Sequence, residues 1–109
     1  MAETSQYCTV LVTVPNGTIA ETIAHALLEA KLAACVSLFP VTSIYTWQGE
    51  VQQEGEVQLL IKTDLVRFSE LEAMVRSLHP YEVPEVIALP IVAGSPPYLQ
   101  WIAEQVTGA

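Results

Sequence analysis

The hydrophobic pattern along the chain alternates between two periods. Runs of β-branched and apolar residues predict four strands, and apolar residues at helical spacing predict two helices between them. We expect strands at 7–14, 35–47, 51–63 and 86–92, and helices at about 18–32 and 64–78. The order strand-helix-strand-strand-helix-strand is the ferredoxin-like α+β plan, in which an antiparallel sheet carries both helices on one face. A single domain, residues 1–109, follows from this order and from the length of the chain.

Local signals indicate where these elements begin and end. Tyr7–Val14 has the composition of a strand that is buried on both faces. Thr18–Glu21 has the form of a capping box at the start of the first helix. Asp64 is placed to cap the second helix, and Pro80 ends it. Ser95–Pro97 is typical of an N-cap followed by first-turn prolines, so we expect a short closing helix after it.

The second and third strands form a long hairpin through the two-residue turn Gln48-Gly49. This turn sets the expected pairs, which are Trp47 with Glu50, Leu38 with Leu59 and Val36 with Ile61. Pro40 predicts a bulge or a sheet edge. Each arm of about 13 residues would extend roughly 43 Å at ~3.3 Å per residue, whereas a domain of this length has a radius of gyration of about 13 Å. The apolar outer half therefore needs another subunit to cover it, and we expect an obligate homo-oligomer.

The charge of the chain excludes several partners. The formal net charge is −8, and the positive residues are only Lys31, Lys62, Arg67 and Arg76. Nucleic acids and anionic membrane surfaces need basic protein surface, so we expect neither as a partner. No apolar run approaches the ~18 residues of a membrane span, and the polar start lacks the features of a signal peptide, so we expect a cytoplasmic protein. Cys8 and Cys35 form no CxxC motif and are expected to be buried thiols.

The segment His79–Glu85 combines an imidazole, a phenol and two carboxylates in a stretch that two prolines hold extended. His79 is the best candidate for a metal ligand, with Glu82 and Glu85 as oxygen donors nearby. The alternative for His79 is a structural hydrogen bond at a helix C-terminus, where the helix dipole favours a cation.

A small-molecule cleft is the second candidate site. Lys62 ends a strand in apolar surroundings, and it is either an anchor for an anionic ligand or the ion-pair partner of a glutamate, with Glu56, Glu82 and Glu85 as the candidates. Four aromatic residues are candidates for the flat walls of such a cleft, namely Tyr45, Trp47, Tyr81 and Trp101. The same side chains are equally suited to holding subunits together.

Catalysis is not expected. The chain has no nucleophile elbow, no phosphate-binding glycine loop and no histidine beside a candidate nucleophile. A binding or structural protein fits these absences better than an enzyme.

Five motifs resemble the CutA divalent-cation tolerance family. In order they are Leu32–Val36, Ser43–Gly49, Leu60–Thr63, His79–Glu85 and Tyr98–Trp101. The resemblance covers about residues 7–106 without an obvious insertion. It implies a ferredoxin-like fold, a compact homotrimer related in shape to the PII signalling proteins, and a role in the response to metal ions such as copper.

The resemblance leaves three classes of function open. The copper-binding pattern of the family has a cysteine near the end of the first strand and a histidine pair before the Pro-Tyr, where this chain has Val12 and Leu78. The first class is binding of copper or another divalent cation by His79 and the nearby carboxylates. The second is PII-like sensing of a small metabolite in the cleft between subunits, held by Lys62 and the aromatic residues. In the third, a stable trimer serves protein contacts alone.

Overall fold

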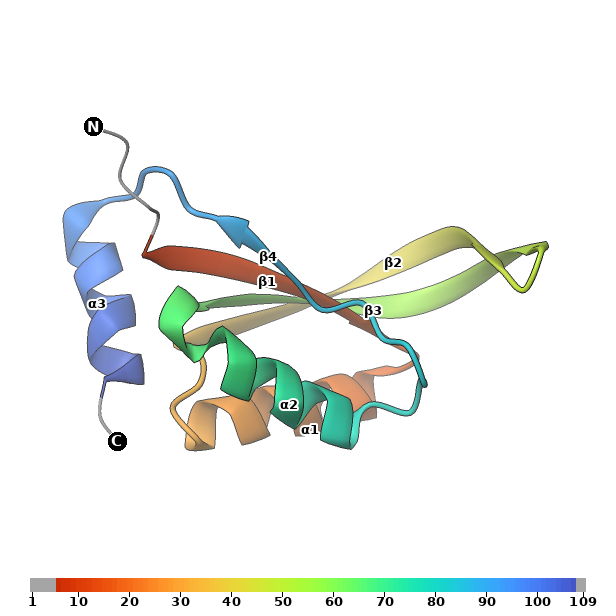
Figure 1. Ribbon diagram of the computed structural model, residues 1–109, viewed down its shortest axis with the longest axis horizontal. Helices are drawn as coiled ribbons and strands as arrows, with labels where there is room; N and C mark the ends of the chain where they lie inside the picture. Colours follow the sequence, from red (N-terminus) through yellow and green to blue (C-terminus); the bar gives the residue numbers. More distant parts are fainter. Residues whose placement is uncertain (1–5, 108–109) are drawn as a thin grey trace.

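The structure, a computed structural model, describes residues 6–107. Its elements are β1 (Tyr7–Val14), α1 (Gly17–Glu29), β2 (Cys35–Trp47), β3 (Glu50–Asp64), the 3-10 helix η1 (Leu65–Arg67), α2 (Phe68–Leu78), β4 (Ile87–Pro90) and α3 (Pro96–Val106). The sheet order is β2-β3-β1-β4, and all neighbouring strands are antiparallel. Helices α1 and α2 cover one face of the sheet, while α3 lies at the end opposite the hairpin tip (Figure 1). The fold is ferredoxin-like, as the predicted order of elements implied.

The β2-β3 hairpin has the predicted register. Gln48 and Gly49 both have positive φ, of 52° and 82°, as the favoured two-residue hairpin turn requires. Pairing then runs without interruption from Trp47 opposite Glu50 down to Cys35 opposite Lys62. The predicted bulge at Pro40 is therefore wrong, but the predicted sheet edge is confirmed, because β2 is an outer strand. Proline has no N–H, and an outer strand tolerates it because only one of its sides forms hydrogen bonds with a neighbouring strand. The outer half of the hairpin projects beyond the two helices (Figure 1).

Helix α1 begins and ends earlier than its pattern predicts. The cap is Asn16 and not Thr18: its backbone is extended, and its Oδ1 accepts a hydrogen bond from the Ile19 N–H at 3.0 Å. The helix ends at Glu29, and Lys31 turns the chain with a φ of 58°. The capping box was a false signal because Asn16, two residues earlier, already satisfies a first-turn N–H.

Two later boundaries also differ in detail. Asp64 is a cap as expected, but it caps η1 by accepting a hydrogen bond from the Val66 N–H at 2.9 Å, and α2 follows. Strand β4 is four residues long, shorter than the predicted 86–92, and it pairs only with β1. Helix α3 starts after Ser95, whose carbonyl and not its side chain accepts the first N–H bonds.

The core lies between the sheet and helices α1 and α2. Strand β1 alternates between buried and half-buried positions, so the expected burial on both faces is wrong for this chain: only Cys8, Val10, Val12 and Val14 are buried. They pack with apolar residues of the two helices, which include Ile23, Leu27, Leu71 and Val75. Cys8 is buried as expected and Cys35 only partly, and both are free thiols. Within residues 6–107, no helix has the length and apolar character to cross a membrane.

Candidate functional site

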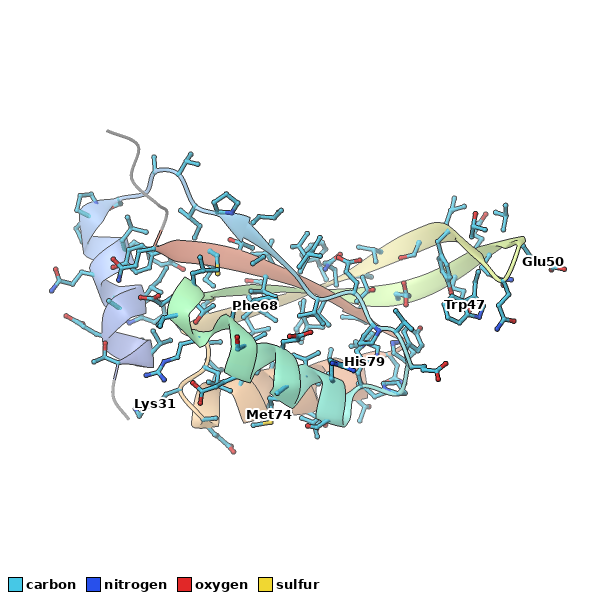
Figure 2. The ribbon with its side chains drawn as sticks, in the orientation of Figure 1. Lys31, Trp47, Glu50, Phe68, Met74 and His79 are labelled. Atoms are coloured by element: carbon cyan, nitrogen blue, oxygen red, sulfur yellow. The ribbon has the colours of Figure 1, made fainter. Side chains whose placement is uncertain are left out.

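A groove of about 710 Å³ lies between the outer half of the hairpin and the segment that connects α2 to β4. Figure 2 labels Trp47, which lines the groove near the hairpin tip, and His79, at the end of α2, where the connecting segment begins. Strand pairing places Ser43, Tyr45, Gln52 and Glu54 on one face of the hairpin, because Tyr45 is opposite Gln52 and Ser43 is opposite Glu54. The lining holds three aromatic residues and four carboxylates, which are Tyr45, Trp47, Tyr81, Glu54, Glu56, Glu82 and Glu85.

His79 holds the connecting segment against the sheet. Its backbone N–H closes α2 by bonding the Val75 carbonyl, and its side chain is only 8% exposed. The ring Nδ1 accepts a hydrogen bond from the Tyr81 N–H at 3.1 Å, so the other nitrogen, Nε2, carries the proton and donates to the Thr13 carbonyl at 2.7 Å. Both ring nitrogens are thus occupied, which is the structural hydrogen-bonding role that the sequence left open for His79.

Tyr81 in turn holds Glu56 at the inner end of the groove. The Tyr81 hydroxyl donates to Glu56 Oε2 at 2.8 Å, and Glu56 is only 7% exposed. Burial, followed by this hydrogen bond, raises the pKa of Tyr81 above its ordinary range. Within residues 6–107, Glu56 has no salt-bridge partner and no side-chain hydrogen bond other than the one from Tyr81.

The negative charge of the groove also affects Tyr45 and Glu85. The Tyr45 hydroxyl donates to Glu54 across the hairpin, and this hydrogen bond raises the pKa of Tyr45 to about 12. Burial, and then the charge of Glu56, raises the pKa of the Glu85 carboxyl. Among the residues that the structure describes, no lysine or arginine lines the groove. The ion pair that the described residues form, Arg67 with Glu70, lies at the start of α2.

Comparison with known proteins assigns the chain to a family. Residues 8–105 match the family model described as CutA1 divalent ion tolerance protein. The chain belongs to this CutA1 family. A divalent-cation tolerance protein CutA from Thermus thermophilus is 53% identical over 96 residues, which are 87% of this chain and 93% of that protein.

Other CutA proteins extend the comparison. A Protein CutA homolog from Xenopus laevis is 54% identical over 85% of this chain, and the match spans only 62% of the frog protein's length. A solved structure from Archaeoglobus fulgidus, described as a periplasmic divalent cation tolerance protein CutA, has a TM-score of 0.90 at 38% identity and covers 92% of this chain and 98% of that one. Because that CutA is described as periplasmic, the cytoplasmic location of this chain stays a prediction.

The groove of this CutA1-family chain contains only part of the predicted ligand cleft. Tyr45, Trp47 and Tyr81 share it, but Lys62 and Trp101 lie elsewhere. Lys62 is opposite Cys35 at the base of the hairpin, six residues along β3 from Glu56, which is about 20 Å of strand. Its Nζ lies 5.7 Å from the centre of the Tyr98 ring, and it forms no ion pair with the groove carboxylates.

The predicted metal ligands are divided in a similar way. Glu82 and Glu85 line the groove, whereas His79 lies behind the connecting segment with both ring nitrogens bonded. In the described part of the chain, no group of three or more His, Cys, Asp or Glu side chains is placed to hold a metal ion. A closed metal site in one subunit does not fit these residues, and metal binding stays a prediction.

The sequence reasoning did not identify Glu54, and it considered Glu56 only as an ion-pair partner of Lys62. A signal for both was present in the strand alternation. Glu54 and Glu56 are two residues apart, as are Tyr45 and Trp47 on the paired strand, and the predicted register places all four on one face.

Proposed function

We propose that this chain forms a homotrimer that binds divalent cations, copper among them, and that serves the cellular response to metal ions without catalysing a reaction. The observation that carries the proposal is the set of four carboxylates around one groove, which no lysine or arginine of residues 6–107 lines. Such a surface concentrates cations and repels anions. The name of the Thermus relative, a divalent-cation tolerance protein, supports the same conclusion.

The chemistry of the groove favours carboxylate oxygens as ligands. Glu82 and Glu85 are exposed residues of the connecting segment, and Glu54 is an exposed residue of the hairpin that lines the same groove. Carboxylates and water suit divalent cations generally, while copper also favours imidazole. His79 would have to give up its bond to Thr13 or to Tyr81 before it bound an ion. We therefore assign binding to the carboxylates and give His79 the role of fixing the segment that carries two of them.

The proposed trimer is supported by unpaired edges and exposed apolar side chains. Strands β2 and β4 are the two edges of the sheet. On the projecting hairpin, Ile44 is 65% exposed and Val51 is 74% exposed. A long apolar edge of this kind invites pairing with another chain, and a closed ring of subunits would remove it without open-ended aggregation.

Copper calorimetry against a weak competing chelator tests the metal proposal. We expect the double variant Glu82→Gln/Glu85→Gln to lose the saturable binding that survives the chelator. Two controls account for non-specific binding, since Cu²⁺ binds exposed imidazoles: His25→Ala removes an exposed histidine, and Glu104→Gln removes an exposed carboxylate outside the groove. Binding that is unchanged in the double variant, or that is lost in His25→Ala, would contradict the proposal.

A second candidate function, sensing of a small molecule, is favoured by the size and walls of the groove. Its volume of about 710 Å³ lies in the range of ordinary ligand pockets, and three aromatic side chains line it. The predicted anionic ligand anchored by Lys62 does not fit, because Lys62 lies at the base of the hairpin. A neutral or positively charged molecule suits the lining better.

A further inference from the structure

We infer that the groove between the hairpin and the α2-β4 segment accepts an organic ammonium ion, whose charge lies at Glu56 and whose apolar body lies against Tyr45, Trp47 and Tyr81. The inference deepens the second candidate function above and rests on it; it does not depend on metal binding.

The strongest support is the condition of Glu56. A carboxylate that is 93% removed from solvent normally has a cation or several donors around it, because an uncompensated buried charge is costly. Glu56 has one donor, the Tyr81 hydroxyl, which bonds Oε2. Its second oxygen, Oε1, forms no hydrogen bond within residues 6–107 and is not fully enclosed by protein, and the groove is the open space that Glu56 lines. A positive group in the groove would supply the missing partner.

The aromatic residues supply the second requirement, a surface for the rest of the ligand. Tyr45 and Trp47 project from the hairpin face that also carries Glu56, and Tyr81 approaches from the connecting segment. An ammonium group within about 6 Å of such rings is attracted by the ring quadrupoles, in addition to its attraction to the carboxylate. Aromatic faces beside a carboxylate bind an organic cation more tightly than an anion or a neutral molecule of the same shape.

The same geometry distinguishes an organic cation from a metal ion. A metal ion needs several ligand atoms that converge on one point, and the residues that the structure describes contain no such group. The groove is far larger than a single ion, at about 710 Å³, and part of its lining is apolar, with Ile44 and Val83 beside the aromatic rings. A ligand with a small charged head and an apolar body uses both features.

Benzylamine and benzyl alcohol are suitable probes because they have the same ring and differ in charge at neutral pH. The two tryptophans report on separate places, since Trp47 lines the groove and Trp101 lies in a shallow depression on α3. We would follow both indole N–H signals by NMR during titration of the whole protein. We expect benzylamine to shift the Trp47 signal saturably and to bind at least about tenfold more tightly than benzyl alcohol, with the Trp101 signal unmoved.

A matched pair of variants assigns the charge. Glu56→Gln keeps the shape of the side chain and an acceptor for Tyr81, and we expect it to weaken benzylamine binding by about tenfold. Glu104→Gln removes one negative charge beside Trp101 and should leave binding unchanged. Because Glu56 is buried, Glu85→Gln serves as a second, more exposed variant that should weaken binding by a smaller factor.

The possible failures are distinguishable. Equal affinity for the two probes, or equal effects of Glu56→Gln and Glu104→Gln, overturns the inference. If neither probe binds while the copper titration depends on Glu82 and Glu85, the inference fails and the proposed metal function stands. If benzylamine binds as expected and copper does not, the inference stands and the metal function fails. If neither cation binds, both fail, as they would if a neighbouring subunit filled the groove.

Discussion

The two ends of the sheet place aromatic side chains beside charges of opposite sign. At the base, the rings of Tyr98 and Trp101 lie 5.5 Å apart, and Lys62 Nζ lies over the Tyr98 ring. At the hairpin end, Tyr45 and Tyr81 donate hydrogen bonds to carboxylates. The base is a packed contact between α3 and the sheet, whereas the hairpin end surrounds a groove.

The base contributes to the stability of the single chain, whereas the hairpin end provides groups that are available for binding. At the base, Ile102 and Val106 bury their side chains, and Arg67 Nε donates to the Val106 carbonyl at 2.9 Å, so α3 is tied down within one chain. At the hairpin end, Ile44 and Trp47 remain largely exposed, and the carboxylates lack positive partners in the described residues. At the base, apolar side chains and polar groups find their partners within one chain. At the hairpin end, the exposed apolar side chains and the carboxylates are free to contact a ligand or another subunit.

Shortening the hairpin should have the largest effect, because it removes most of the hairpin end and leaves the base unchanged. Replacing Tyr45–Gln52 by Asn-Gly keeps a two-residue turn between Ile44 and Gln53, which are already paired. We expect the sheet, the helices and the α3 contact to survive, as judged by circular dichroism, and the proposed trimer to be lost. Size-exclusion chromatography with light scattering should give monomer or aggregate. A well-behaved trimer from this variant would show that the hairpin does not hold the assembly.

A pair of isoleucine truncations sharpens the comparison next. Ile102→Ala empties a fully buried position at the base, and we expect it to lower the free energy of unfolding by about 2–5 kcal/mol. The matched change Ile44→Ala removes the same atoms from a side chain that is 65% exposed in one chain, so the loss should be smaller. Both are measured by denaturant unfolding at several protein concentrations.

The concentration series decides what a loss at Ile44 means. A loss for Ile44→Ala that grows on dilution identifies burial between subunits. Equal losses for the two variants that do not depend on concentration would contradict the separation of a packed base from an open hairpin end.

The fold was largely predictable because its determinants are local. Gln48 and Gly49 adopt the positive φ that their turn requires, and strand alternation then fixed the register down to Cys35 opposite Lys62. The error at the start of α1 arose because two nearby residues offered the same local interaction. Asn16 and Thr18 are both good caps, and the extended backbone at Asn16 decided between them.

The candidate site was less predictable because its contacts are remote in sequence. His79 meets Thr13 across 66 residues, and Tyr81 meets Glu56 across 25. A list of chemically suitable residues cannot show which ring nitrogen is already bonded. The predicted register already placed Lys62 opposite Cys35, at the base of the hairpin, so it argued against the pairing of Lys62 with Glu56 that the sequence analysis considered.

Truncating His79 tests whether it positions the connecting segment. His79→Ala leaves the Thr13 carbonyl and the Tyr81 N–H without their partner, so we expect a loss of about 1–3 kcal/mol in the free energy of unfolding. The loss should be the same with and without a metal chelator, as measured by denaturant unfolding. His25→Ala, an exposed change, should have little effect. A loss that appears only when metal ions are present would instead make His79 a ligand.

Tyrosine titration tests the smallest effect, the hydrogen bond that Tyr45 donates to Glu54. That bond raises the pKa of Tyr45 to about 12. A free tyrosine ionises at about pH 10, so the Tyr45 phenol should ionise at a distinctly higher pH. Because the neutral phenol is favoured in the folded state, its contribution to stability is present below pH 10 and is lost as the pH rises toward 12. Glu54→Gln removes the charge and should lower the pKa of Tyr45, as followed by tyrosinate absorbance.

Two variants make this titration specific to the hairpin end. Tyr45→Phe identifies the Tyr45 step by removing it. Glu104→Gln removes the same single negative charge from a carboxylate on α3, so it should leave that step in place. If Glu54→Gln and Glu104→Gln shift the Tyr45 step by the same amount, overall charge and not the cross-strand bond sets its pKa. The hairpin face would then be less ordered than the base, because Tyr45 and Glu54 would not be held together across the two strands.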